Sequence, residues 1–77
     1  MRYRYTVIIE QDEDGDYIAE VPALQGCYSQ GKSYEEALMN IQDAIRLHIE
    51  ARKQLGEDVP IERAVEEVEI YEPTASS

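Results

Sequence analysis

The chain has 77 residues, of which seven are Lys or Arg and 17 are Asp or Glu, for a formal net charge of −10. This length leaves room for one domain, and such a domain buries only about 60% of the surface that its unfolded chain exposes. One sheet with one covering helix is therefore near the practical minimum. The charge argues against direct binding to DNA or RNA, whose phosphates need cations. It favours fast encounter with a basic protein, or else it only maintains solubility.

Cysteine use and hydropathy indicate where the protein works. Cys27 is the only cysteine, so the chain cannot close an internal disulfide and suits a reducing cytoplasm. No apolar run approaches the roughly 20 residues that span a bilayer, and the apolar stretch near the start is too short for a signal peptide. We expect a cytoplasmic protein without a membrane segment.

The first third of the chain predicts a β-hairpin. Residues 3–10 alternate as in a half-buried strand, and a core-facing set is predicted at Tyr3, Tyr5, Val7 and Ile9. Residues 12–16 are rich in turn-forming Asp and Gly, and residues 17–21 then form a second short strand. Pro22 lacks the N–H that would continue a ladder, so we expect a turn at residues 23–26 and a third strand at residues 27–30.

A capping box predicts the start of a helix. Ser33 and Glu36 have the S-x-x-E spacing in which each side chain can satisfy the other residue's backbone donor. A helix over residues 34–55 then has one apolar stripe, with Gly56 in the left-handed position after it. The predicted stripe comprises Tyr34, Ala37, Leu38, Ile41, Ala44, Ile45, His48 or Ile49, Ala51 and Leu55.

Residues 65–71 alternate again and predict a last strand, with Val68 and Ile70 on one face. We expect a single domain over residues 1–72 and a disordered tail over residues 73–77. The predicted fold class is therefore α+β: a small β-β-β-α-β domain whose largely antiparallel sheet is covered by one long helix.

No group of residues in the sequence predicts catalysis, a cofactor or a metal. In the acidic stretch at residues 12–16, Gly15 precedes Asp16, and Tyr17 stands where a calcium loop needs its glycine. The stretch is typical of an ordinary hairpin loop. Cys27 and His48 are the only thiol and imidazole, and no residue is evident that would orient His48 as a base. A nuclease relic using Glu10, Glu20 or Asp43 remains a third hypothesis, although their spacing does not require a metal site.

The order of residues in the middle of the chain resembles the HicB family of antitoxins. The matching segments are Asp14-Gly15-Asp16-Tyr17, then Pro22, Gly26-Cys27-Tyr28-Ser29-Gln30-Gly31, and Glu35-Glu36-Ala37-Leu38-Met39-Asn40-Ile41-Gln42-Asp43-Ala44-Ile45. These motifs are specific in combination and weak separately. The resemblance implies a β-β-β-α-β domain similar in outline to a partial ribonuclease H fold.

The resemblance also implies a partner, a small basic HicA-type toxin that cleaves messenger RNA and that the antitoxin covers. Many members of the family carry a second, DNA-binding domain, and this chain ends at Ser77 without a basic segment. We therefore expect a stand-alone module that does not repress its own operon.

Two main hypotheses follow for the function. The first is an antitoxin-like protein that is not an enzyme and that binds and neutralises a basic HicA-type toxin. The second is a homo-oligomeric structural or regulatory module without a toxin, which associates through apolar and Tyr-rich edges. For the first hypothesis, the predicted partner-binding residues are Glu10, Asp12, Asp14, Glu20, Glu66, Glu67 and Glu69.

Overall fold

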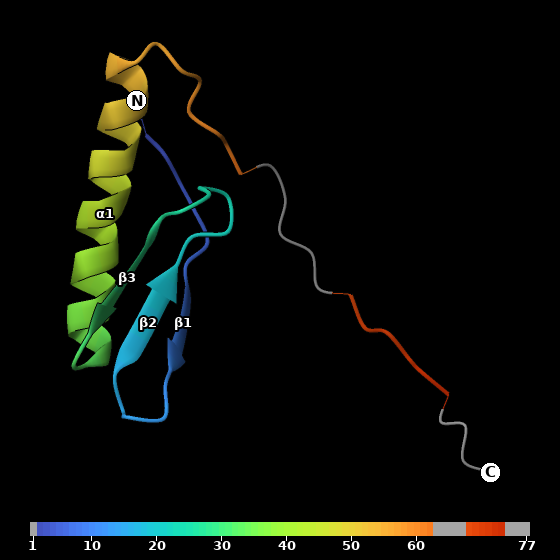
Figure 1. Ribbon diagram of the computed structural model, residues 1–77. Helices are drawn as coiled ribbons and strands as arrows, with labels where there is room; N and C mark the ends of the chain where they lie inside the picture. The colour runs from blue at the N-terminus through green and yellow to red at the C-terminus, as the bar shows by residue number, and fades with distance from the viewer. Residues whose placement is uncertain (1, 63–67, 74–77) are drawn as a thin grey trace.

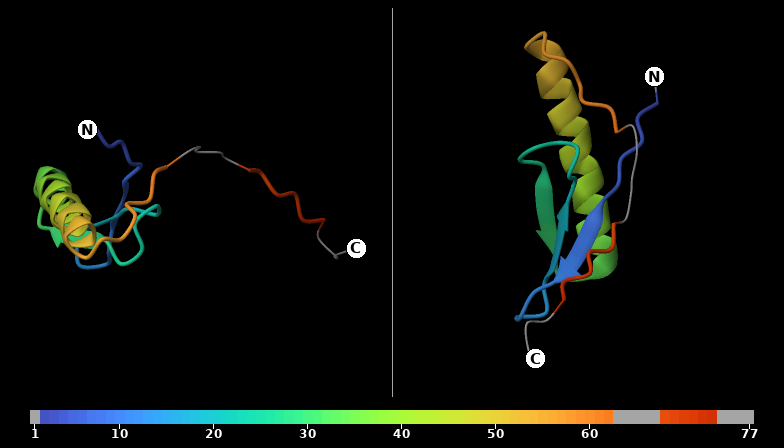
Figure 2. Two further views of the ribbon diagram at one scale, coloured as in Figure 1. Left: turned by 90° about the horizontal axis from the view of Figure 1, so that it is seen from above. Right: turned by 90° about the vertical axis from the view of Figure 1, so that its right-hand side faces the viewer.

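A computed structural model describes residues 2–62 and 68–73 of the chain. Its elements follow the order β1 (Ile8–Gln11), β2 (Tyr17–Glu20), β3 (Tyr28–Gly31) and α1 (Tyr34–Gln54). The three strands form one antiparallel sheet in the order β1-β2-β3. The helix covers one face of this sheet (Figures 1 and 2). The prediction of a small α+β domain, with an antiparallel sheet and one long helix, is confirmed.

The hydrophobic core lies between α1 and the sheet. Its buried side chains come from β2, from the turn that follows β2, and from the first half of the helix: Ala19, Val21, Leu24, Cys27, Ala37 and Ile41. Tyr5, Val7 and Ile9 pack against this cluster, as the alternation of the first strand predicts. Leu24 was predicted only as part of a turn, yet its side chain is completely buried. The turn is fixed by two hydrogen bonds of 3.0 Å, from the Leu24 N–H to the Val21 carbonyl and from the Cys27 N–H to the Leu24 carbonyl, with the Leu24 side chain in the core.

The first strand is shorter than predicted. Pairing with β2 begins only where Ile8 lies opposite Glu20, so residues 3–7 are not part of the ladder. Continuing the ladder would bring residue 6 opposite Pro22, which has no N–H to donate. The proline therefore ends both strands at the same level.

The ends of α1 are closed by local hydrogen bonds. The Ser33 side chain accepts a bond from the Glu36 N–H at 3.1 Å, as predicted, but the Glu36 carboxylate accepts from the Lys32 N–H at 2.8 Å and not from Ser33. At the other end, the N–H groups of Gly56 and Glu57 donate to the carbonyls of Lys53 and Arg52, with Gly56 at φ +73°. This is a Schellman motif, and it explains why glycine occupies this position.

The predicted helical stripe is correct in its middle and wrong at its ends. Ala37 and Ile41 are buried, and Leu38, Ala44 and Ile45 pack beside them. Ala51 and Leu55 are exposed because the C-terminal end of the helix extends past the sheet (Figure 1). Tyr34 is half exposed at the helix start, where its ring meets the Tyr17 ring edge-on. The last two turns of α1 therefore project beyond the strands.

After the helix the chain returns to the N-terminal segment. The Tyr5 hydroxyl donates to the Pro60 carbonyl at 2.6 Å, and burial raises the pKa of this hydroxyl. Both oxygens of the Glu62 carboxylate accept bonds from Thr6, from its backbone N–H at 2.8 Å and from its hydroxyl at 2.5 Å. Glu62 is thus held next to the residues that lead into β1.

The last predicted strand does not form over its described part. Residues 68–71 carry no strand, and Val68, Ile70 and Tyr71 are exposed. A strand is stable only beside another strand, and residues 68–73 lie away from the sheet (Figure 1). Residues 65–67 of this prediction lie outside the described residues, as does most of the predicted tail at residues 73–77.

The close approach of β3 to α1 predicts that Gly31→Ala is strongly destabilising. A Cβ atom at Gly31 would lie 2.5 Å from the backbone nitrogen of Ala37, which only a shift of the helix can relieve. Overpacking of this kind costs about 1–3 kcal/mol or more. Urea unfolding followed by circular dichroism measures it. Gly56→Ala is the control, because its Cβ meets no atom and its cost of about 1 kcal/mol comes only from the positive φ. An equal loss in both variants would contradict the steric explanation.

The bonds between Glu62 and Thr6 predict a specific pH dependence of stability. They lower the pKa of the Glu62 carboxylate below its ordinary value. A carboxylate whose pKa is lower in the folded state stabilises the folded protein at every pH above its ordinary pKa of about 4.3. This stabilisation is lost as the pH falls through the folded-state pKa. The free energy of unfolding of the wild type minus that of Glu62→Gln should be constant at neutral pH and should shrink on acidification. Glu57→Gln, at an exposed residue, is the control. A difference that does not change with pH would contradict the prediction.

Candidate protein-binding surface

The face of the sheet opposite α1 is open. Strand alternation turns Ile9, Tyr17 and Ala19 towards the helix, so their neighbours along each strand point the other way. The register places these outward residues in two rows across the sheet: Ile8, Glu20 and Tyr28 in one, and Glu10, Ile18 and Gln30 in the other. Among the described residues, no helix covers this face (Figure 2). We call these six residues the outer face.

Apolar and acidic side chains alternate on the outer face. Ile8 and Ile18 are each 40% exposed, and Tyr28 is 69% exposed. Glu10 and Glu20 separate them, because each glutamate lies opposite an isoleucine on the neighbouring strand. Such a surface offers apolar area together with fixed negative charge. Both are properties of a protein–protein interface.

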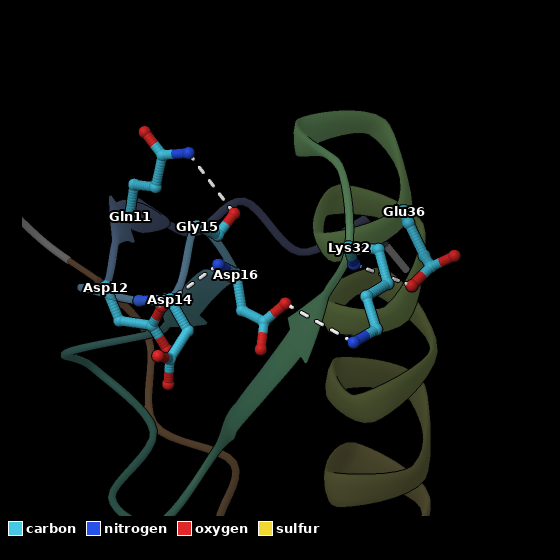
Figure 3. A network of polar contacts seen from close by, with 7 residues as sticks. All are labelled: Gln11, Asp12, Asp14, Gly15, Asp16, Lys32 and Glu36. Atoms are coloured by element: carbon cyan, nitrogen blue, oxygen red, sulfur yellow. Dashed lines mark hydrogen bonds and ion pairs between the residues drawn. The ribbon is translucent and has the colours of Figure 1, made fainter.

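Basic residues are concentrated at the end of the domain opposite the hairpin loop, where Glu50, Glu57, Asp58 and Glu62 also lie. The hairpin loop next to the outer face carries Asp12, Glu13, Asp14 and Asp16. The nearest cation in this part of the chain is Lys32, whose Nζ lies 3.6 Å from an oxygen of Asp16 (Figure 3). Arg2, Arg4, Arg52 and Lys53 belong to the N-terminal segment and the last turn of α1, at the other end of the molecule (Figure 1). The end that bears the hairpin loop is therefore strongly acidic.

The predicted partner-binding residues fall into three groups. Glu10 and Glu20 lie together on the outer face, and Asp14 is exposed in the adjoining loop. Asp12 lies in the same loop, but its carboxylate is engaged by the backbone. Glu69 is exposed on the segment away from the sheet, and Glu66 and Glu67 lie outside the described residues. The structure therefore brings Glu10, Glu20 and the loop together, and it does not bring Glu69 to them.

The acidic hairpin loop is organised by its own backbone. One oxygen of Asp12 accepts bonds from the N–H groups of Asp14 and Asp16, both at 2.9 Å, while Gly15 takes a φ of +88° (Figure 3). Asp16 faces Lys32. In the described part of the chain, no three His, Cys, Asp or Glu side chains are close enough to hold a metal ion. The Asp12 side chain stabilises a turn here.

Cys27 and His48 line the same shallow hollow, but their chemistry does not suit catalysis. Cys27 is buried, and burial raises the pKa of its thiol, which favours the unreactive protonated form. The Nε2 atom of His48 accepts a hydrogen bond from Arg52 at 2.9 Å. That lone pair is already used, so this nitrogen cannot take a proton from the thiol.

Sequence reasoning missed the apolar part of the outer face. Ile18 and Tyr28 were not proposed as partner-binding residues, and Ile8 was only placed on the outward side of its strand. The signal was present in the strand alternation, which puts Ile8 and Glu10 on the same side. What was missing was the register, which makes Ile18 and Tyr28 neighbours of these residues.

The fold and the open face define a small α+β domain with one helix-covered and one acidic sheet face. The chain belongs to the HicB-like antitoxin family of bacterial toxin–antitoxin systems, whose family model matches residues 5–74. The resemblance stated from the motifs is confirmed.

Individual relatives agree with this assignment. A UPF0150 protein of Thermoplasma acidophilum is 52% identical over 68 residues, which cover 88% of this chain and 97% of that protein. A UPF0150 protein of Synechocystis is 48% identical over 60 residues, covering 78% of this chain and 76% of the relative. The crystal structure of the N-terminal domain of the Burkholderia pseudomallei antitoxin HicB matches with a TM-score of 0.69 and 30% identity, over 77% of this chain and 69% of that chain.

The single helix gives no sign of a membrane segment. Within residues 2–62 and 68–73, no helix combines the length and the apolar character that crossing a bilayer requires.

The burial of Cys27 predicts a slow reaction with thiol reagents. Only 5% of this residue is exposed, and its thiol has a raised pKa. Labelling by Ellman's reagent at neutral pH should be at least about tenfold slower in the native protein than in urea. The time course of absorbance gives both rates. Equal rates would show that Cys27 is accessible and ionised in the folded state.

Proposed function

We propose that this protein is an antitoxin that binds and neutralises a small basic toxin of the HicA type, which cleaves messenger RNA. Membership of the HicB-like antitoxin family supports an antitoxin role. The HicA type of the toxin is what the resemblance to HicB antitoxins implies, and the outer face is the observation that supports a basic protein partner. Its exposed Ile8, Ile18 and Tyr28 provide apolar contact area, and Glu10 and Glu20 stand between them.

The charge arrangement supports a basic partner. A ribonuclease must attract RNA phosphates, so the surface around its active site carries cations. Carboxylates held on a rigid sheet can occupy the same positions as phosphates and so exclude RNA. The acidic hairpin loop extends the negative field beyond the sheet and accelerates encounter by long-range attraction. Apolar contacts then provide affinity, while Glu10 and Glu20 determine orientation.

The proposed contact set begins with the predicted residues that the fold gathers at one end. Glu10 and Glu20 contact the toxin directly, with Asp14 at the periphery. Asp12 acts indirectly, because its carboxylate holds the loop in shape. Glu66, Glu67 and Glu69 stay part of the proposal only as a further source of negative charge.

The protein acts by occupying a surface, and we infer that it is not an enzyme. Cys27 is buried, and His48 accepts a bond from Arg52. The net charge of −10 makes direct binding to nucleic acid unfavourable. We further propose that it works in the cytoplasm, where messenger RNA and the toxin meet.

A salt-dependent titration tests the proposal. The protein is titrated calorimetrically into a purified HicA-type toxin, a small basic protein. Raising NaCl from about 50 to about 300 mM should weaken binding by at least about tenfold. The double variant Glu10→Lys, Glu20→Lys should weaken it by about 100-fold at low salt and should release RNA cleavage by the toxin.

The matched control is Glu50→Lys with Glu57→Lys. It makes the same charge change at exposed residues of α1 and the segment after it, away from the outer face. It should alter affinity only slightly. No binding at low salt, or equal losses for both double variants, would refute the proposed site.

A further inference from the structure

A second surface lies on the other side of β1, between α1 and the N-terminal segment. It is a groove of about 460 Å³. Three residues before β1 form one wall and three helix residues form the other: Tyr3, Tyr5 and Val7, and Leu38, Ile45 and Ile49. The helix packs closely on β3 and β2 and touches β1 least, which leaves these apolar side chains only partly covered.

The edge of β1 next to this groove is unpaired. The Asp12 N–H donates to the Asp16 carbonyl, so these two residues form a hydrogen-bonded pair. Such pairs occur at every second residue of an antiparallel ladder, so Glu10 and Ile8 also bond to β2. The peptide groups of Ile9 and Gln11 therefore point outward, away from β2. No described strand lies beyond β1. At the opposite edge, the Asn40 side chain donates to the Gln30 carbonyl at 2.8 Å, so α1 already occupies part of the β3 edge. The open edge of the sheet is therefore on β1.

Basic residues gather around this groove. Arg46, which also pairs with Asp43 at 2.6 Å, is part of its lining, and the Lys53 ammonium lies 5.4 Å from the centre of the Tyr3 ring. Arg2 and Arg4 flank Tyr3 in the chain and are exposed. Four of the seven Lys and Arg residues in an acidic protein thus stand beside one apolar groove. This surface suits an acidic ligand with apolar side chains, and it does not suit a basic toxin.

A segment with these properties exists in the chain itself. Residues 68–72 read Val-Glu-Ile-Tyr-Glu, with no basic residue. Val68, Ile70 and Tyr71 are 70%, 76% and 86% exposed, which is unusual for three apolar residues in four positions. The alternation of Val68, Glu69 and Ile70 is that of a strand with one apolar face.

Residues 68–72 cannot easily reach the groove of their own copy, because Glu62 of the same chain is held at Thr6. Glu62 is held at Thr6, and five residues separate it from Val68. A strand continuing alongside β1 from there would place residue 68 opposite residue 12, beyond the end of β1 at Gln11. The groove at Tyr3 and Tyr5 lies in the opposite direction from Thr6. A second copy of the chain, which has no such tether, can approach the groove directly.

We propose that two copies of this protein exchange their C-terminal segments, so that residues 68–72 of each copy occupy the groove and the β1 edge of the other. The backbone of the segment pairs with the outward peptide groups of Ile9 and Gln11. Val68 and Ile70, on one face of the segment, enter the groove, and Glu72 on the same face meets the cations beside it. A two-fold axis relates the two identical contacts and closes the assembly as a dimer. The outer face of each copy stays free, so this dimer does not depend on the proposed toxin.

Sedimentation velocity of the full chain across a concentration series tests the dimer. The wild type should sediment as a dimer, and Ile70→Asp should weaken the dimer by at least about tenfold, since it puts a charge into the apolar groove. Leu47→Asp is the matched control, because it makes the same change at a helix residue that is 67% exposed and lies outside the groove. It should leave the dimer intact. A monomeric wild type would overturn the proposal and leave the groove to the chain's own segment or to another protein.

Charge exchange tests the pairing of the segment with the groove. Arg46→Glu and Glu72→Arg should each weaken the dimer, because residue 72 lies on the same strand face as Val68 and Ile70, and a mixture of the two variants should associate more tightly than either variant alone. Equal weakening in the mixture would overturn the assigned contact.

Photo-crosslinking distinguishes exchange from folding back within one chain. A photoreactive residue at position 70 is activated in a mixture of ¹⁵N-labelled and unlabelled protein. Crosslinked peptides that contain residues 3–7 or 38–49 and carry one labelled and one unlabelled half support exchange between copies. Crosslinks only within one isotopic form, or only to other peptides, overturn it.

Discussion

The packing of α1 against β3 is the contact on which the rest of the structure depends. At Gly31 the strand lies so close to the first turn of the helix that a single Cβ atom would collide with the backbone at Ala37. This contact fixes the helix over β3 and β2, and Ile41 shares with Leu24 and Ala19 a core that comprises six buried side chains of the described residues. Among residues 2–62 and 68–73, α1 is the only helix that packs on the sheet. The helix therefore covers one face of the sheet, and its position over β3 leaves β1 less protected.

Two surfaces follow from this off-centre packing. The face opposite the helix stays open and carries Glu10 and Glu20 between apolar residues. The side of β1 leaves a groove along the helix, near Tyr3 and Ile45. Charge separates the two surfaces further, because the acidic hairpin loop adjoins the first and most cations adjoin the second. In our two proposals, the basic partner and the second copy bind to different surfaces of the domain and so do not compete.

Several parts of the fold could be predicted from local chemistry. Ser33 and Glu36 indicated the helix start to the residue, and Gly56 indicated its end within one residue. The turn-forming residues 12–16 predicted the hairpin, and the motif run identified the family. Other parts depended on contacts between distant residues. The burial of Leu24, the early end of the ladder at Pro22 and the exposure of Leu55 follow from how far the sheet extends, which periodicity along one segment does not specify.

The same distinction between local chemistry and distant contacts applies to the candidate site. The sequence by itself determined the acid excess, the absence of a disulfide, the alternation that makes each strand two-faced, and the caps that bound the helix, because these depend on residue type and near neighbours. Only the tertiary structure decided which carboxylates share a surface, that Asp12 is used by its own loop, and which sheet edge stays open. The physical reason is register: a pairing between strands joins residues that are far apart in the chain, and no local pattern encodes that pairing uniquely.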